Sequence, residues 1–162
     1  MNSAIERLLT LRVVNVMSRD VIQVSPRQNM ADAADLLFEH EISGAPVVDE
    51  SGRCVGVLSA TDFVRERCRR RVRAQGPDRE PGVSPGDVLP GQACVGFDAH
   101  RVADHMTPIL HSISEGSTLV EAARSMCDHH IHRLMVLDDH GHLRGVLSSL
   151  DVAAAFISAI EE

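Results

Sequence analysis

Residues 42–62 read ISGAPVVDESGRCVGVLSATD, and residues 131–151 read IHRLMVLDDHGHLRGVLSSLD. The second stretch repeats the first, 89 positions further along the chain. The match extends without a gap over residues 13–62 and 102–151, where 15 of the 50 pairs are identical. Two copies are too few for a solenoid, so we expect two similar halves that pair face to face as one unit. Clefts at such a seam are common sites for small molecules.

Each copy predicts the same order of elements, β-α-β-β-α. Helix-start chemistry is offered by Ser25-Pro26 and Ser114-Glu115, because a serine hydroxyl accepts hydrogen bonds from free backbone N–H groups. Apolar residues then recur at three- and four-residue spacing, which is typical of a helix. Hairpin turns are expected at the glycines that follow the first strand of each copy. The corresponding segments are VIQV and ILHSI before the helices, APVVD and LMVLD as first hairpin strands, and CVGVLS and LRGVLS as second strands.

The chain divides into four predicted segments. These are a helical segment (1–12), a first repeat (13–73), a Pro/Gly-rich linker (74–100) and a second repeat (101–160). Six arginines fall between Val64 and Ala74 on a predicted helix. They indicate either a solvated helix face that pairs with the acidic remainder of the chain, or a cationic wall near a bound phosphate.

Composition excludes several classes of protein. Hydrophobic residues make up 44% of the 162 residues and aromatic residues only 2%, so we expect an aliphatic core. A net charge of −7 argues against nonspecific nucleic-acid binding. No apolar run is long enough to span a membrane, and the first residues lack the layout of a secretory signal. The four cysteines form no C-x-x-C pair, so we interpret them as reduced thiols of a cytoplasmic protein.

A Ser-x-x-Asp motif closes the last strand of each copy, with Ser59 and Asp62 in the first and Ser148 and Asp151 in the second. One interpretation is helix capping, which favours these residue types at a strand-to-helix junction. The other is ligand binding, because a fixed carboxylate can accept hydrogen bonds from both ribose hydroxyls. Free helix N–H groups and the serine hydroxyl can hold a phosphate.

The two copies differ just before the first hairpin strand. Copy one has Gly44, which allows a flat ring to approach the backbone. Copy two has His132 and Arg133. Arginine offers forked, permanently charged donors for phosphate oxygens, and histidine adds a titratable donor. The alternative for this pair is a surface salt bridge to Asp128 or Asp138, which stabilises little.

Taken together, these motifs resemble the tandem cystathionine-β-synthase (CBS) domain pair, or Bateman module. The matching segments are VMSRDVIQVSP, ISGAPVVDESGRCVGVLSATDF, HMTPILHSIS and IHRLMVLDDHGHLRGVLSSLDV, within residues 12–157. The chain is also similar to the γ subunit of AMP-activated protein kinase in its S/T-x-x-D ends and its His-Arg pair. The resemblance implies an α/β fold (α+β) of two β-α-β-β-α repeats, packed sheet to sheet with pseudo-twofold symmetry.

The resemblance also implies two ligand clefts. In the first, Asp62 would bind the ribose, with Ser59 and Thr61 on its phosphate side, and His132 and Arg133 would reach the phosphates. The adenine would be enclosed by Ser18, Val21, Ile22, Ile42, Gly44 and Val57. The second cleft would use Thr107, Leu110, His111, Ile131, Ser148 and Asp151. Because uncharged Ser43 and Gly44 replace the His-Arg pair there, we expect the Asp62 cleft to bind more tightly.

The function implied is a non-enzymatic sensor of AMP, ADP or ATP, with NAD or S-adenosylmethionine as other adenosyl ligands. Occupancy would change the arrangement of the repeats, and an unidentified protein partner would read that change. The alternative is a dimerisation or adaptor module with empty clefts, in which a homodimer forms through the CBS helices. Apolar residues 153–157 and Leu8, Leu9 and Leu11 offer surface for that contact. No metal site is predicted, because the nine histidines show no repeated ligand spacing.

Overall fold

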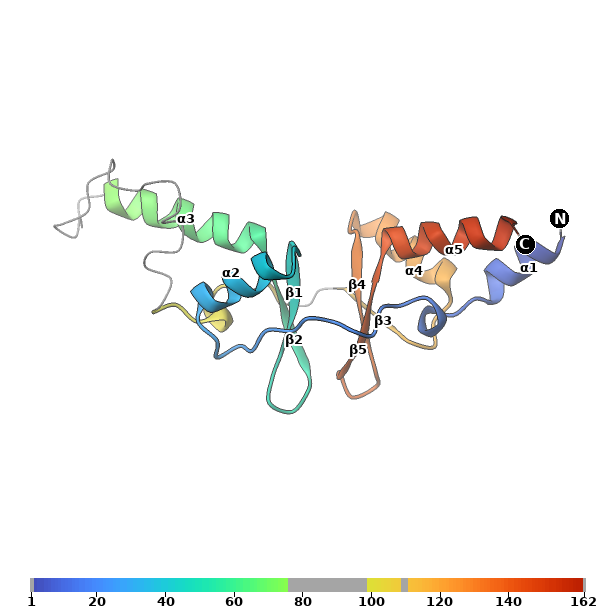
Figure 1. Cartoon of the computed structure of the whole chain (residues 1–162), viewed down its shortest axis with the longest axis horizontal. Helices are drawn as coiled ribbons and strands as arrows, with labels where there is room; N and C mark the ends of the chain where they lie inside the picture. Colours follow the sequence, from blue (N-terminus) through green and yellow to red (C-terminus); the bar gives the residue numbers. More distant parts are fainter. Residues whose placement is uncertain (1, 76–98, 109–110, 162) are drawn as a thin grey trace. The chain divides into compact units, whose positions relative to one another are not determined.

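The computed structural model describes residues 2–75, 99–108 and 111–161. These residues form five helices, five strands and two short 3₁₀ segments, and Figure 1 shows their arrangement within each unit. The first half contains α1 (Asn2–Thr10), η1 (Val13–Asn15), α2 (Met30–Glu39), β1 (Gly44–Val48), β2 (Cys54–Ser59) and α3 (Ala60–Gln75). The second half contains η2 (Val102–Asp104), β3 (Ser112–Ser114), α4 (Leu119–His129), β4 (Arg133–Leu137), β5 (Leu143–Ser148) and α5 (Ser149–Glu161).

Each repeat is built around one β-hairpin. Strands β1 and β2 form a two-stranded sheet, and β3, β4 and β5 form a three-stranded sheet in which β3 runs parallel to β4. The hairpin turns contain Gly52 and Gly141, each with a φ of +83°, a conformation that L side chains rarely adopt. The mixed α/β fold class and the order of the two repeats are confirmed. In repeat 1 the VIQV segment forms only an isolated bridge, Val24 to Val47, rather than a strand.

The helices begin four residues later than the serines predict. Asn29 caps α2 by accepting from the N–H of Asp32, and Thr118 caps α4 in a capping box with Glu121. Ser25 and Ser114 instead accept from N–H groups two residues ahead, in the turns that precede these caps. The prediction was wrong because a serine hydroxyl satisfies a turn as readily as a helix end.

The chain forms two compact units that do not coincide with the sequence repeats. The first contains residues 1–22, 50–54 and 109–162, and the second contains residues 23–49 and 55–108. Each repeat's hairpin and helices are therefore completed by a segment from outside that repeat. Val13, at the head of repeat 1, is fully buried in the core of Leu119, Leu134 and Leu147.

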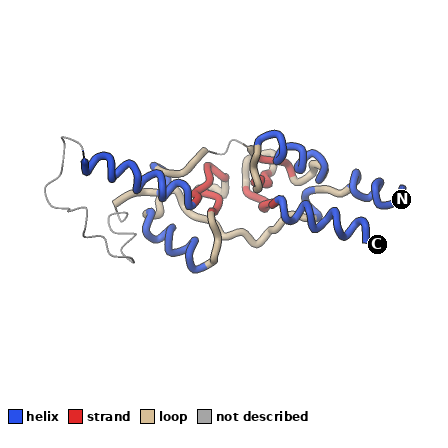
Figure 2. The backbone as a smooth tube through the Cα atoms, turned by 90° about the horizontal axis from the view of Figure 1, so that it is seen from above, coloured by secondary structure: helices blue, strands red, loops and turns tan. Residues whose placement is uncertain are grey.

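The second unit has the corresponding arrangement. Val102, at the head of repeat 2, is fully buried in the core that contains Met30, Val47 and Leu58. Both cores are aliphatic, as the composition predicts. Within each unit the helices lie on one side of the strands (Figures 1 and 2). Most of the predicted linker, residues 76–98, lies outside the described residues.

Candidate functional site

The carboxylate of Asp62 is the most heavily engaged polar group at either Ser-x-x-Asp motif. Its side chain is only 1% exposed, at the junction where β2 ends and α3 begins. One oxygen, Oδ2, accepts from the backbone N–H of Ser59 at 2.8 Å and from its hydroxyl at 2.9 Å. The other, Oδ1, accepts from Nη1 of Arg65 at 3.0 Å and from the hydroxyl of Thr107 at 3.1 Å. Four donors match the roughly four lone-pair positions of a carboxylate.

Asp151 makes the same contacts with its serine as Asp62 does, and these are the contacts that cap the helix. Its Oδ2 accepts from the backbone N–H of Ser148 at 2.8 Å and from the Ser148 hydroxyl at 2.6 Å. The Ser148 hydroxyl oxygen also lies 3.2 Å from the backbone N of Asp151, which donates to it. Helix capping, one of the two sequence interpretations, is therefore confirmed for both motifs. Capping does not exclude ligand binding, because the same groups face the helix start.

The structure groups Thr107 and Ser18 differently from the sequence analysis. Thr107 forms a two-way backbone bridge with Val57 on β2, which brings its hydroxyl to Asp62 rather than to the Asp151 group. Ser18 makes the equivalent bridge with Val146 on β5 and belongs to the unit that contains Asp151. The cause is that the first residues of each repeat, 13–22 and 102–108, lie in the unit formed mainly by the other repeat. We call these residues lead segments. Because the two repeats exchange them, sequence position does not identify the unit that a lead segment completes.

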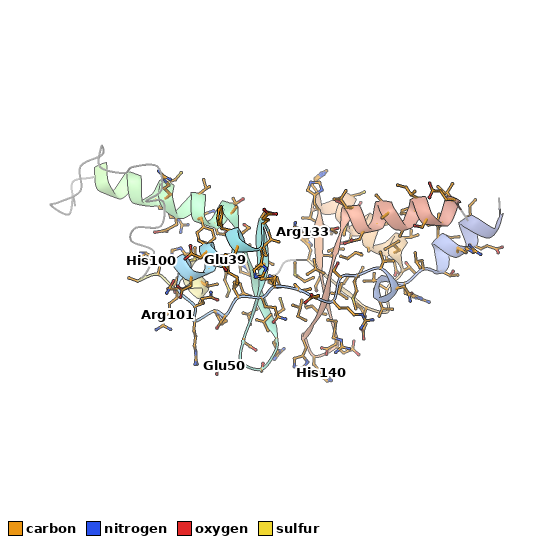
Figure 3. The ribbon with its side chains drawn as sticks, in the orientation of Figure 1. Glu39, Glu50, His100, Arg101, Arg133 and His140 are labelled. Atoms are coloured by element: carbon orange, nitrogen blue, oxygen red, sulfur yellow. The ribbon has the colours of Figure 1, made fainter. Side chains whose placement is uncertain are left out.

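The residues before each hairpin are tied to the Ser-x-x-Asp junction of their own unit. The carbonyl of Ser43 accepts from the N–H of Ala60 at 2.9 Å, and that of His132 accepts from Ser149 at 2.9 Å. Arg133 lies directly opposite Ser148 in the β4–β5 ladder, and its side chain is exposed. In Figure 3 it lies at the end of the hairpin away from the turn residue His140. The structure thus brings the His-Arg pair beside Asp151.

Asp138, one of the acids considered as a partner of Arg133, is engaged within its own turn. Its Oδ1 accepts from the N–H groups of His140 and His142 at 2.9 Å, and its Oδ2 lies 3.2 Å from Nδ1 of His142. These contacts, the backbone hydrogen bond from His142 above all, lower the pKa of Asp138. Asp138 therefore stabilises the β4–β5 turn.

The other candidate residues take varied positions. Val21 and Ile22 are half-buried in the unit that contains Asp151, and Thr61 is exposed on the first turn of α3. Ile131 is half-buried, and the ring of His111 stacks on that of His129 with centroids 3.9 Å apart. Leu110 lies outside the described residues. Four candidate residues are half-buried in the unit that contains Asp62, namely Ile42, Gly44, Val57 and Ser59.

An open hollow of about 720 Å³ lies beside one of these residues. It is lined by Leu37, Phe38, Glu39, Glu41, Ile42 and Ser43, at the end of α2. Phe38 is 85% exposed there. The hollow places an apolar surface next to Ile42, which the resemblance assigns to the adenine.

Sequence reasoning missed the specific role of Arg65. The arginine-rich segment was considered as a whole, but Arg65 is the member that follows Asp62 by three residues, so both side chains lie on one face of α3. That spacing was readable in the sequence. None of the helices within the described ranges is long and apolar enough to cross a bilayer.

Comparison with known proteins agrees with this architecture. The CBS domain model matches residues 13–68 and 102–158. The γ-3 subunit of the bovine 5'-AMP-activated protein kinase is 26% identical over 139 residues, which cover 86% of this chain and 24% of that protein. CBSX2 from Arabidopsis thaliana is 29% identical over 145 residues, covering 86% of this chain and 60% of that protein.

Two solved structures share the fold. A crystal structure of CBSX2 in complex with AMP has a TM-score of 0.69 at 24% identity, and the match covers 94% of this chain and 99% of that one. The CBS domain pair of protein MJ0100, in complex with 5'-methylthioadenosine and S-adenosylmethionine, has a TM-score of 0.66 at 19% identity, covering 92% and 98%. The duplicated hairpin, the two Ser-x-x-Asp junctions and these matches show that the chain belongs to the CBS domain family, as a tandem pair.

Proposed function

We propose that this protein is a non-catalytic regulatory module that binds an adenosine-containing ligand, AMP, ADP or ATP, between its two CBS repeats. Occupancy changes the arrangement of the repeats, and a cytoplasmic protein partner reads that change. Ligand binding can shift this arrangement only if the ligand prefers one arrangement over the other.

The donor set on Asp62 is the observation that carries the proposal. Ser59 supplies two donors that belong to the helix cap, whereas Arg65 and Thr107 supply two that a ligand can replace. A ribose diol offers two hydroxyl donors, which is the number held on Oδ1. The side chain of Arg65 is 52% exposed, so it can move without opening the core. Ribose binding at Asp62 is therefore an exchange of donors, with no loss of the cap.

The released guanidinium of Arg65 would then face the phosphate side of the bound nucleoside. This assigns one arginine of α3 to the cationic wall considered from the sequence. His132 and Arg133 supply the second cationic group, from the other repeat. Arg133 is exposed at the head of β4, and a forked guanidinium binds phosphate oxygens in a bidentate manner.

The relatives support an adenosine ligand without selecting one. CBSX2 is described with AMP, and the MJ0100 pair with 5'-methylthioadenosine and S-adenosylmethionine. The shared part is adenosine, and these ligands differ at the 5' position. In this chain Arg65, which contacts Asp62, favours a 5'-phosphate over an uncharged thioether, and the proposal adds Arg133 to the same phosphate.

Calorimetric titration of the full chain with AMP, ADP, ATP and S-adenosylmethionine tests the proposal. We expect saturable binding of a nucleotide, a loss of at least about 10-fold in affinity for Asp62→Asn, and a similar loss for Arg133→Ala. Asp151→Asn is the matched control and should have the smaller effect. If Asp151→Asn removes binding while Asp62→Asn does not, the primary site is the one beside Arg133 within its own unit. If the wild-type protein binds none of the four ligands, the proposal is wrong.

A second candidate function, dimerisation through the CBS helices, is favoured by an exposed apolar stripe on α5. Leu150 is 78%, Ile157 56% and Ile160 72% exposed, and these positions recur at helical spacing. On α1, Ile5 is 56% and Leu9 57% exposed. We expect a homodimer by sedimentation at micromolar concentration and a monomer for Ile157→Glu. A monomeric wild-type protein would contradict this candidate function and leave the nucleotide proposal standing.

A further inference from the structure

Three side chains with metal-binding atoms meet in the second unit, and none of them belongs to the Ser-x-x-Asp motif. They are Glu66 of α3, His100 and His105, and each offers one ligand atom within 4.8 Å of the other two. Nδ1 of His100 lies 3.0 Å from Nε2 of His105, and Nδ1 of His105 lies 3.4 Å from Oε2 of Glu66. The Glu66 and His105 side chains are only 8% and 9% exposed. A carboxylate and two imidazoles thus share one largely buried space.

Backbone hydrogen bonds hold the two histidines in place, and Glu66 is buried on α3. The carbonyl of His100 accepts from the N–H of Met30 at 2.8 Å, which fixes it at the start of α2 (Figure 3). The N–H of His105 donates to the carbonyl of Val102 at 3.0 Å, which closes the 3₁₀ segment η2. Val102 itself is fully buried, and Glu66 lies on the buried face of α3. The fold therefore holds the backbone of each ligand residue in place.

We propose that Glu66, His100 and His105 bind a divalent transition-metal ion of the Zn²⁺ type. Imidazole nitrogens and a carboxylate oxygen are preferred zinc ligands, whereas Mg²⁺ and Ca²⁺ take sets of oxygen ligands. Metal–nitrogen bonds of about 2.0–2.1 Å in a tetrahedron place ligand atoms about 3.3 Å apart. The 3.0 Å contact uses Nε2 of His105 and the 3.4 Å contact uses its Nδ1, so only one of the two can be an edge of that tetrahedron. Because the three ligand atoms lie within 4.8 Å of one another, rotation of the His105 ring would bring one of its nitrogens to an ion together with the other two ligands, and water would complete the fourth position.

A network of hydrogen bonds is the alternative for the same three residues. Each short contact joins two metal-binding atoms, so the pair either forms a hydrogen bond or turns toward a shared ion. The network alone requires no binding of metal, so the two explanations differ in a measurable way. The proposal is also independent of nucleotide binding, since neither Asp62 nor Thr107 is a ligand. It departs from the sequence analysis, which predicted no metal site.

Metal titration of the full chain separates these explanations. The protein, kept reduced, is titrated calorimetrically with ZnCl₂ and separately with MgCl₂, and its Co²⁺ complex is examined by visible absorption. We expect one Zn²⁺ site, no Mg²⁺ binding at the same concentrations, and the intense visible bands of four-coordinate Co²⁺. His100→Ala and Glu66→Gln should each lower the Zn²⁺ affinity of this site by at least about 10-fold.

The chain offers a matched control for adventitious binding to its other histidines. His140, in the exposed β4–β5 turn, lies near His142, with ring centroids 6.1 Å apart. His140→Ala should retain the Zn²⁺ affinity and the Co²⁺ spectrum. Circular dichroism establishes that each variant is folded, and His105→Gln replaces any variant that is not. Unchanged Zn²⁺ binding in the folded cluster variants, or loss in His140→Ala, would overturn the proposal in favour of the hydrogen-bond network.

Discussion

The two Ser-x-x-Asp junctions share a motif and differ in what surrounds it. At both, the carboxylate accepts from the N–H and the hydroxyl of the serine three residues earlier. At Asp62, Arg65 and Thr107 add two donors, and the side chain is 1% exposed. Asp151 is half-buried, and alanine occupies the position that matches Arg65.

The Ser-x-x-Asp motif by itself therefore indicates a helix cap, and the residues around it determine what else the carboxylate can bind. The cap is the part that both copies retain. The additional groups come from outside the motif, on α3 and on the segment after η2. Glu66, in the proposed metal site, also has an alanine at the matching position of the second copy, Ala155. Both proposed binding functions of the second unit therefore depend on residues that the first unit lacks.

The greatest loss of stability is expected from substitution of the two glycines, Gly56 and Gly145, that let a lead segment pass close to each hairpin. A Cβ on Gly56 would lie 2.8 Å from the carbonyl oxygen of Thr107, and one on Gly145 would lie 2.7 Å from that of Ser18. Backbone cannot yield cheaply, so we expect Gly56→Ala and Gly145→Ala each to cost about 2–3 kcal/mol in free energy of unfolding by urea denaturation. Gly56→Ala should also weaken nucleotide binding, because it displaces Thr107 from Asp62. Equal stability of the variants and the wild type would contradict the observed backbone bridges.

The next prediction compares how much each carboxylate contributes to the free energy of unfolding. Asp62→Ala removes a cap and leaves the Ser59 and Thr107 donors without their acceptor, so we expect a loss of about 2–3 kcal/mol. Asp151→Ala removes a cap alone and should cost about 1 kcal/mol. Thermal and urea unfolding of both variants give the comparison. Losses of equal size would mean that the donors on Oδ1 add nothing to stability.

Much of the fold could be predicted from the sequence. The repeat, the hairpins with their turn glycines and the aliphatic cores depend on local patterns, and local patterns are visible in one chain. The helix starts were misplaced because Ser25 and Ser114 cap turns, while Asn29 and Thr118 cap the helices. A choice between two capping side chains four residues apart depends on backbone angles that the sequence does not encode locally.

The site was harder to predict because its members come from distant segments. Asp62 and Thr107 are 45 residues apart, and the predicted linker lies between them. Sequence order places Thr107 with repeat 2, whereas its backbone pairs with β2 of repeat 1. The exchange of lead segments is a property of packing, and a repeat-by-repeat interpretation assigns those segments to the wrong unit. The same exchange brings His100 and His105 to Glu66, which no ligand spacing predicts.

A smaller effect is expected from exchanging the residue that distinguishes the two helices, Arg65 on α3 and Ala154 on α5. Arg65→Ala should change the free energy of unfolding by less than about 1 kcal/mol, because the guanidinium is half exposed. Its effect on nucleotide affinity should be larger, since the proposal assigns it to the phosphate. Ala154→Arg tests the converse, and it should raise the affinity at Asp151. Calorimetry with ATP and with adenosine measures both. If the two ligands respond equally, Arg65 does not act through phosphate.

The smallest change in stability is expected at the capping box that begins α4. In the α4 box, the backbone N–H of Thr118 donates to Glu121 at 2.8 Å, and this bond, the Thr118 hydroxyl and nearby Arg12 lower the pKa of Glu121 below 4.5. A carboxyl with a lowered pKa stabilises the folded state above its unfolded value, and that contribution is lost as the pH falls through the folded value. We therefore expect wild type to unfold at a slightly higher temperature than Glu121→Gln at pH 7, with the difference shrinking below pH 4.5. Thr118→Ala should remove part of the same pH dependence, because it deletes one of the causes. A difference that grows in acid would show that the box does not hold Glu121 in its charged form.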